Sequence, residues 1–134
     1  MATVETSTTP WPADEMKKYL WLDEYLRQQP ATEKVFQPTW QADKYMLRQK
    51  MYAYIGMQDK ENRPIITLKL DPLYSDALRQ AYPDIVPGYY MNKVHWSTVY
   101  LDGAVPRAIL EEMVRAAHKT VFATLPKKIQ AELS

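Results

Sequence analysis

The sequence predicts an α+β domain: an antiparallel sheet of four to six strands with three main helices packed mainly on one face. Three observations lead to this prediction. Apolar residues recur at helical spacing in three separated segments, and shorter segments between them alternate apolar and polar residues. Short polar links join consecutive strands, as in antiparallel pairing. Helices would then cover one face of the sheet and leave the other at least partly open.

The first helix is predicted over residues 13–28. Pro12 suits the start of a helix because its missing N–H would be unpaired there, and Pro30 stops the helix. One apolar face is formed by Met16, Tyr19, Leu22 and Leu26. Trp21 and Tyr25 project elsewhere. They indicate a second contact surface, which either meets a protein partner or a second copy of the chain, or is covered by sheet edges or the N-terminal arm.

Residues 33–70 are predicted to form strands. The pattern around residues 35–39 is short and ambiguous, whereas residues 44–48 alternate. Residues 50–57 alternate methionine, alanine and isoleucine with tyrosine, so both faces of this strand are partly apolar. After a polar connection, residues 65–70 form a further strand with isoleucine and leucine on one face.

The second half of the chain is predicted to hold two helices and one clear strand. Asp71 is a good N-cap and Pro72 a good first residue for the second helix. Its predicted buried side consists of Leu73, Ala77, Leu78 and Ala81. A loop or a short strand is expected at residues 86–90. A strand over residues 95–101 precedes the third helix, residues 106–124, and residues 127–133 form one more short helical piece.

The bulk composition is that of one globular domain. Apolar residues make up 46% of the 134 residues and charged residues 25%, which is ordinary. We expect residues 1–11 to be a flexible arm and residues 12–134 to form a single domain. The chain has no cysteine, and it shows neither a signal peptide nor a membrane-spanning run. We therefore expect a cytoplasmic protein.

Three runs of the sequence are distinctive. They are RPIITLKLDP at residues 63–72, YPDIVPGYY at residues 82–90 and NKVHWSTVYLDG at residues 92–103, and Leu-Pro-Lys-Lys follows at residues 125–128. On these runs, and on looser similarity over roughly residues 13–130, the chain resembles the MmcQ/YjbR family.

The resemblance implies a compact α+β domain related to the secretion-chaperone-like fold. Members of this family carry a "double wing" DNA-binding label, and the resemblance implies no catalytic or ligand residues. One departure concerns the turn before Lys50, where the family usually has Gly-Gly and this chain has Arg48 and Gln49. A type I′ turn needs positive φ at both central residues, which Arg and Gln resist. We expect a longer hairpin or another type of turn.

The most interesting candidate site surrounds His95. Asn92 and Tyr90 lie close to it in the sequence, and Lys93 and Trp96 flank it. Either His95 and Asn92 contact a ligand while an aromatic ring stacks on it, or His95 bonds the backbone and Trp96 fills the core. We favour the second interpretation, in which His95 is structural.

A basic patch is the second candidate. Lys50, Lys69, Lys93, Lys127 and Lys128 could gather around Tyr52, Tyr54 and Tyr90, which would offer stacking surfaces for exposed bases. The alternative is a solvated face whose lysines protect sheet edges. The net charge of +1 and the isoelectric point of 7.9 do not demand a polyanionic partner.

The sequence gives no sign of a metal, a cofactor or a catalytic group. The two histidines show no ligand spacing, and Glu111 is expected to pair with Arg115 rather than with His118. No nucleophile, acid and base stand in a recognisable order. We therefore expect a non-enzymatic binding domain, possible ligands being DNA, as the family label suggests, or a protein partner of a chaperone-like module.

Overall fold

The computed structural model describes residues 13–58, 62–88 and 91–134. The strands are β1 (Glu33–Gln37), β2 (Ala42–Leu47), β3 (Lys50–Gln58), β4 (Arg63–Lys69), β5 (Ile85–Pro87) and β6 (Trp96–Tyr100). The helices are α1 (Ala13–Gln28), α2 (Pro72–Ala81), α3 (Arg107–Phe122) and α4 (Lys127–Leu133). Residues 35–37 of the ambiguous segment therefore belong to β1, whereas residues 38 and 39 lie in the turn after it, and the short helical piece at the end is a helix.

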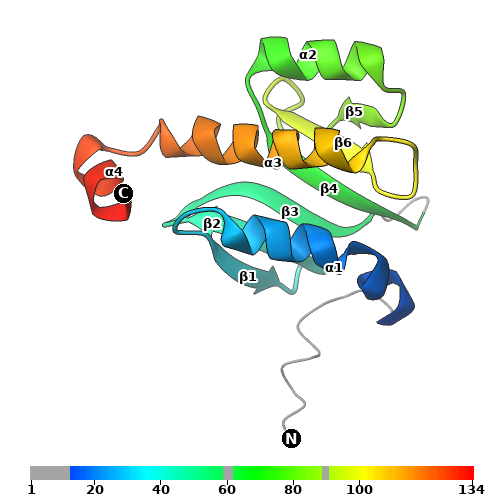
Figure 1. Ribbon diagram of the computed structural model, residues 1–134, viewed down its shortest axis with the longest axis horizontal. Coiled ribbons are helices and arrows are strands. Elements are labelled where there is room, and N and C mark those ends of the chain that lie inside the picture. Colours follow the sequence, from blue (N-terminus) through cyan, green and yellow to red (C-terminus); the bar gives the residue numbers. More distant parts are fainter. Residues whose placement is uncertain (1–12, 59–61, 89–90) are drawn as a thin grey trace, which may run out of the picture.

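The strands form one sheet in the order β1-β2-β3-β4-β6-β5, and every neighbouring pair is antiparallel. Figure 1 shows α1 and α3 running across one face of this sheet, with α2 beside β5 and α4 beyond the end of α3. The predicted fold class, an α+β domain with an antiparallel sheet and helices mainly on one face, is confirmed. The face that no helix of the described residues covers is called the open face below.

The main core lies between the helices and the sheet. Leu22 and Leu26 of α1 are fully buried there, as the predicted apolar face of this helix requires. The buried residues of α3 are Leu110, Met113, Val114, Ala117 and Val121. Because α3 packs against β2, β3 and β4, its apolar stripe fixes the helix over the centre of the sheet.

A β-bulge gives this core an extra tyrosine. The register between β2 and β3 shifts after Tyr45 and before Met46, so Tyr52 has no partner on β2. An extra residue interrupts the alternation of side chains, and both Tyr52 and Ala53 face the helices. The hydroxyl of Tyr52 donates to the carbonyl of Leu26 at the end of α1 (3.2 Å). Tyr52 is therefore part of the core and not a stacking surface of the predicted basic patch.

The helix α2 begins as predicted. Asp71 Oδ2 accepts hydrogen bonds from the backbone N–H groups of Leu73 (3.1 Å) and Tyr74 (3.3 Å), and Pro72 is the first residue of the helix. This N-cap satisfies donors that have no partner inside the helix.

The predicted buried face of α2 is largely wrong. Leu73 is 82% exposed, and Ala77 and Ala81 are exposed as well. Only Leu78 of the predicted set is buried, together with Ser75. Ser75 is buried because its hydroxyl accepts a hydrogen bond from Ser97 of β6, so a polar contact rather than an apolar stripe orients this side of the helix.

The turn between β2 and β3 has two residues, Arg48 and Gln49, since Leu47 pairs with Lys50. Arg48 has φ 57°, and Gln49 is not among the residues of positive φ. A positive φ at the first central residue alone is typical of a type II′ turn rather than type I′. The hairpin is therefore of another type, as expected, but it is not longer.

Trp21 and Tyr25 pack against the main core and meet α3. The guanidinium of Arg107 stands over the Trp21 ring, 4.3 Å from its centroid. Arg115 donates a hydrogen bond to the hydroxyl of Tyr25 (2.6 Å). These intramolecular contacts take up part of the second surface that the two aromatic residues indicate in the sequence.

The predicted arm of residues 1–11 lies outside the described part of the chain. Within the described part, no helix combines the length and the apolar character needed to span a bilayer.

Candidate binding site on the open face of the sheet

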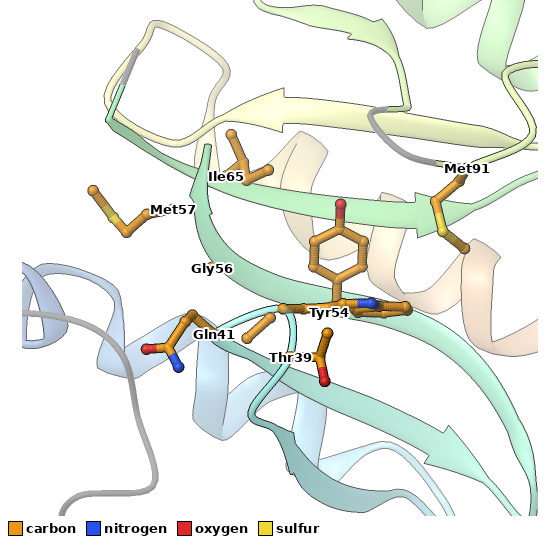
Figure 2. Close-up of a pocket in the computed structure, with 9 residues that line it drawn as sticks. Thr39, Gln41, Tyr54, Gly56, Met57, Ile65 and Met91 are labelled. Carbon is orange, nitrogen blue, oxygen red and sulfur yellow. The ribbon is translucent and has the colours of Figure 1, made fainter. Parts of the chain in front are cut away.

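The open face holds a cavity of about 390 Å³ beside β2, β3 and β4 (Figure 2). Its floor is low because Ala42 of β2 pairs with Gly56 of β3, which pairs with Ile65 of β4. A Cβ atom on Gly56 would lie only 3.1 Å from the Cβ of Ala42. Two small residues side by side therefore hollow the sheet at this point, and the volume is within the range of ligand sites, about 300–1,000 Å³.

The walls of the cavity are mostly aromatic and thioether side chains. Trp40, in the turn between β1 and β2, is 43% exposed and its ring centroid lies 5.5 Å from that of Tyr54 on β3. Met57 and Met91 lie at opposite ends of the cavity in Figure 2. Thioethers adapt to ligands of different shape. The indole of Trp40 offers a large apolar surface, part of which stays exposed in the described structure.

Among the described residues, the lining also contains the polar side chains of Thr39 and Gln41, and Tyr54 adds a phenolic hydroxyl. The Gln41 side chain donates to the carbonyl of Pro38 (3.0 Å), and Gln41 itself has φ 52°. This hydrogen bond holds the turn that carries Trp40. The described part of the lining therefore supplies one amide, the hydroxyls of Thr39 and Tyr54 and apolar surface, and it contains no histidine, carboxylate or lysine that could activate a nucleophile.

A lysine stands at the rim. Lys44 of β2 is directly opposite Tyr54 in the register of β2 and β3, and its Nζ atom lies 5.7 Å from the centroid of the Trp40 ring. Such a position is typical of a cation–π contact at an exposed site.

Methionines are unevenly distributed over the fold. Met46 and Met51 face each other across β2 and β3 on the open side, and Met57 and Met91 line the cavity. Met113 is fully buried in the main core. Of the five methionines whose side chains are described, two therefore line the cavity and two more lie further along β2 and β3 on the open face.

The lysines of the predicted basic patch form two groups. Lys50 reaches the end of α3, where its Nζ lies 3.2 Å from the hydroxyl of Thr124, and Lys127 and Lys128 begin α4 just after it. The other group consists of Lys69, opposite Trp96 in the sheet, and Lys93, in the loop before β6, whose Nζ lies 3.5 Å from the carbonyl of Gly88.

The loop before β6 is held by Asn92 and by its own backbone. Asn92 Oδ1 accepts from the N–H groups of Val94 (2.9 Å) and His95 (3.3 Å). The carbonyl of His95 accepts from the N–H of Leu70 (2.8 Å), while its side chain is exposed. The favoured interpretation, in which the His95 side chain holds the loop, is therefore corrected: the amide of Asn92 does so. Trp96 is buried, as expected, and Tyr90 lies outside the described residues.

Arg79 of α2 fixes the same loop from the helix side, a role that sequence reasoning missed. Its Nη2 donates to the carbonyls of Lys93 (2.7 Å) and Trp96 (2.9 Å), and its Nε donates to the hydroxyl of Ser97 (3.1 Å). A planar fork of donors is suited to several acceptors at once. Arginine in the last turn of a helix is common, so the sequence holds no signal that would identify these acceptors.

A buried polar cluster ties α1 to the first two strands. Asp23 accepts hydrogen bonds from Tyr45 (2.6 Å), Lys34 (2.9 Å) and Arg27 (3.0 Å), and Asp43 lies 4.0 Å from the same lysine. Burial on its own raises the pKa of Asp23, but the bonds from Tyr45 and Lys34, the charge of Lys34 and the bond from Arg27 together hold it below its ordinary value. Burial, followed by the negative charge of Asp23, raises the pKa of Tyr45. The cluster is enclosed and serves packing.

The residues weighed as metal ligands make other contacts. His118 Nε2 lies 2.8 Å from the carbonyl of Pro30, and its ring stacks on Phe122. Glu111 accepts from Arg107 (3.1 Å). The expected pair of Glu111 with Arg115 is therefore replaced by a pair one turn earlier, because Arg115 bonds the hydroxyl of Tyr25.

Comparison with known proteins decides the family. A model of the YjbR family matches residues 27–120. This chain belongs to the YjbR family. It is 32% identical over 105 residues to "Uncharacterized protein YjbR" of Escherichia coli (strain K12), covering 78% of this chain and 87% of that protein. It is 40% identical over 83 residues to "Uncharacterized protein YbdF" of Escherichia coli O157:H7, covering 60% of this chain and 68% of that protein.

Solved structures agree with the YjbR assignment. The crystal structure of DR2400 from Deinococcus radiodurans, with a DUF419 domain, superposes with a TM-score of 0.73 at 32% identity and covers 84% of both chains. A crystal structure from Pseudomonas syringae gives a TM-score of 0.60 at 24% identity, covering 73% of this chain and 93% of that one, and supports the fold alone. The names of these YjbR-like proteins describe no activity, so they leave the ligand open.

Sequence reasoning does not single out the residues that give this YjbR-family chain its cavity, namely Trp40, Met57 and Met91. One signal for Trp40 exists in the sequence. A tryptophan between threonine and glutamine, in a turn between two strands, is a large apolar side chain in a segment expected to face water. The low floor has no such signal, because only the register brings Ala42 beside Gly56.

Proposed function

We propose that this YjbR-family chain is a non-enzymatic binding domain that takes an apolar side chain of a protein partner into the cavity on the open face. The observation that carries the proposal is the half-exposed indole of Trp40 over a hollow of about 390 Å³. Large aromatic side chains next to a preformed pocket are typical anchors of protein interfaces.

Two further observations favour a protein partner. The two methionines that line the cavity, Met57 and Met91, allow the surface to repack around different side chains, as in other adaptable binding proteins. Both histidines lie away from the cavity, His95 in the loop before β6 and His118 bonded to Pro30. A general base within reach of a bound group is needed for most hydrolytic chemistry, and the described residues of the lining include no histidine, carboxylate or lysine.

DNA is the second candidate, and one observation favours it. Lys69 lies beside Trp96 at the end of β4, and Lys93 lies in the adjoining loop, so two cations flank one corner of the sheet. Against it, Lys50 is bonded to Thr124 at another corner, and the net charge is only +1. On duplex DNA, the logarithm of the affinity falls with the logarithm of the salt concentration, and each phosphate contact adds about −0.9 to this slope.

The pocket is tested by NMR titration of the isotope-labelled chain with N-acetyl-phenylalanine amide at millimolar concentrations. We expect shifts of the Trp40 indole N–H and of the amides of Thr39 and Gly56. Trp40→Ala should remove them. Leu73→Ala, which truncates a side chain that is 82% exposed on α2, is the matched control and should leave them unchanged. Shifts that survive Trp40→Ala would contradict the proposal.

The second candidate is tested with duplex DNA at low salt. If Lys69 and Lys93 contact phosphates, replacing both with glutamine should reduce the salt slope by about two. Binding to DNA with that change in slope, together with no shift at the cavity for the phenylalanine derivative, would place DNA ahead of the protein partner.

A further inference from the structure

The open face carries positive charge close to the cavity. The alternation along β1, β2 and β4 places four charged side chains on this face, which are Glu33, Lys44, Arg63 and Lys69. Arg63 is neutralised by Asp102, with Nη2 and Nε 2.7 Å and 3.0 Å from the same carboxylate oxygen. Glu33 lies on the edge strand, opposite Met46. Of the described charged side chains that remain, Lys44 is the one placed beside the cavity, because it lies opposite the lining residue Tyr54.

Lys44 is the one at the rim. Its Nζ approaches the Trp40 ring at 5.7 Å, and no carboxylate of the described residues lies within ion-pair distance of it. Lys34, which points to the other face of the sheet, shows the contrast: its Nζ is 2.9 Å from Asp23 and 4.0 Å from Asp43. The described part of the fold thus places two carboxylates beside Lys34 on the helix side and none beside Lys44 at the cavity.

We propose that the protein segment bound by the cavity is acidic, with carboxylates on residues next to its apolar anchor, and that Lys44 selects for them. This inference rests on the proposed function, because it needs an anchor in the cavity. A carboxylate that meets Lys44 leaves water only partly and completes a charge-assisted contact. The cavity would hold the apolar anchor, and the charge of Lys44 would favour partners whose neighbouring residues are acidic. Both features are needed for this preference.

A nucleic acid would also bring negative charge, but the geometry favours a peptide. The ring of Trp40 is already contacted by the Lys44 ammonium and by the Tyr54 ring, which leaves less of its face for a stacked base. A side chain that enters the hollow from above needs no free face of the indole, since it packs against the walls.

The test uses blocked tripeptides that differ only in charge. Acetylated and amidated Asp-Phe-Asp, Asn-Phe-Asn and Lys-Phe-Lys are titrated into the full chain and followed by NMR at the Trp40 indole N–H. We expect the aspartate peptide to bind about three- to fivefold tighter than the asparagine peptide at low salt, as for one partly exposed ion pair. Lys-Phe-Lys should bind most weakly, and high salt should reduce the differences.

Variants separate this inference from the proposed function. Lys44→Gln should bring the aspartate peptide down to the affinity of the asparagine peptide and leave the latter unchanged. Lys119→Gln, on the helix side of the fold, removes the same net charge and should keep the preference. Equal affinities in the unmodified chain, or a preference that survives Lys44→Gln, would overturn the inference while the pocket stands. No binding of any tripeptide, with binding of oligo-dT at low salt, would overturn both.

Discussion

Tyr45 offers a direct test of the buried cluster between α1 and the sheet. Its side chain is almost fully buried, and its hydroxyl donates to Asp23 Oδ1 over 2.6 Å. Tyr45→Phe keeps the ring and removes only this hydrogen bond. A bond to a charged group stabilises a protein by about 1.5–3 kcal/mol. Because Lys34 remains on the same carboxylate oxygen at 2.9 Å, the acceptor is not orphaned, and we expect the lower part of that range, about 1.5–2 kcal/mol.

Urea unfolding monitored by circular dichroism at neutral pH measures this free energy of unfolding. Tyr52→Phe is the matched control, because the hydroxyl of Tyr52 bonds neutral groups, the carbonyl of Leu26 and the hydroxyl of Thr32. It should cost less, about 0.5–1.5 kcal/mol. A cycle that combines Tyr45→Phe with Asp23→Asn isolates the pair, since the second change should cost less once the first has been made.

The pH dependence adds a second check. The pKa of Asp23 is lowered in the folded state from 3.8, so its contribution to stability is present above that pH and is lost as pH falls through the folded pKa. The difference between the unmodified chain and Tyr45→Phe should therefore shrink in strong acid. A cost below about 0.5 kcal/mol at neutral pH, or one that grows in acid, would refute the reasoning.

Three other predictions concern single contacts. Asp71→Ala should cost about 1 kcal/mol in urea unfolding, because it removes the N-cap of α2; an unchanged midpoint would contradict this. His95→Ala should change stability by less than about 0.5 kcal/mol, whereas Asn92→Ala should cost about 1 kcal/mol, because its Oδ1 accepts two backbone N–H groups; the reverse order would restore a structural His95. Burial, partly offset by the bond from Thr32, raises the pKa of Tyr52 from 10.0 to about 12. The neutral Tyr52 side chain therefore contributes fully to the stability of the fold below pH 10, and the free energy of unfolding should fall between pH 10 and 12. Tyr52→Phe should reduce that fall, as pH-dependent melting curves can show.

Local sequence signals predicted the elements better than they predicted the faces. Asp71 and Pro72 mark the start of α2 because capping depends on neighbouring residues alone. The face that α2 buries depends instead on its partner, and the hydroxyl of Ser97 draws Ser75 inward where an apolar pattern favoured Leu73. In α3, whose apolar stripe is long and regular, pattern and packing agree.

The candidate site was harder to predict because register and bulges create it. No propensity places Gly56 beside Ala42, and the bulge at Tyr52 moves that tyrosine from the expected alternation into the main core. The predicted site residues were chosen from unusual runs of sequence, and several of them, such as Asn92 and Trp96, are used for structure. The lysines were predicted to form one patch on the basis of charge alone, whereas the structure places one group near the end of α3 and the other beside β4 and β6.

The uneven distribution of methionines makes the chain suited to methyl spectroscopy. Selective labelling with ¹³C at the methionine methyl groups would give one narrow signal per methionine without assigning the backbone. Met46, Met51, Met57 and Met91 would report on the open face, and Met113, enclosed in the main core, would serve as an internal reference. A ligand that binds to the open face would shift the methyl signals of these four methionines and leave the Met113 signal unchanged, whereas unfolding would shift all five signals.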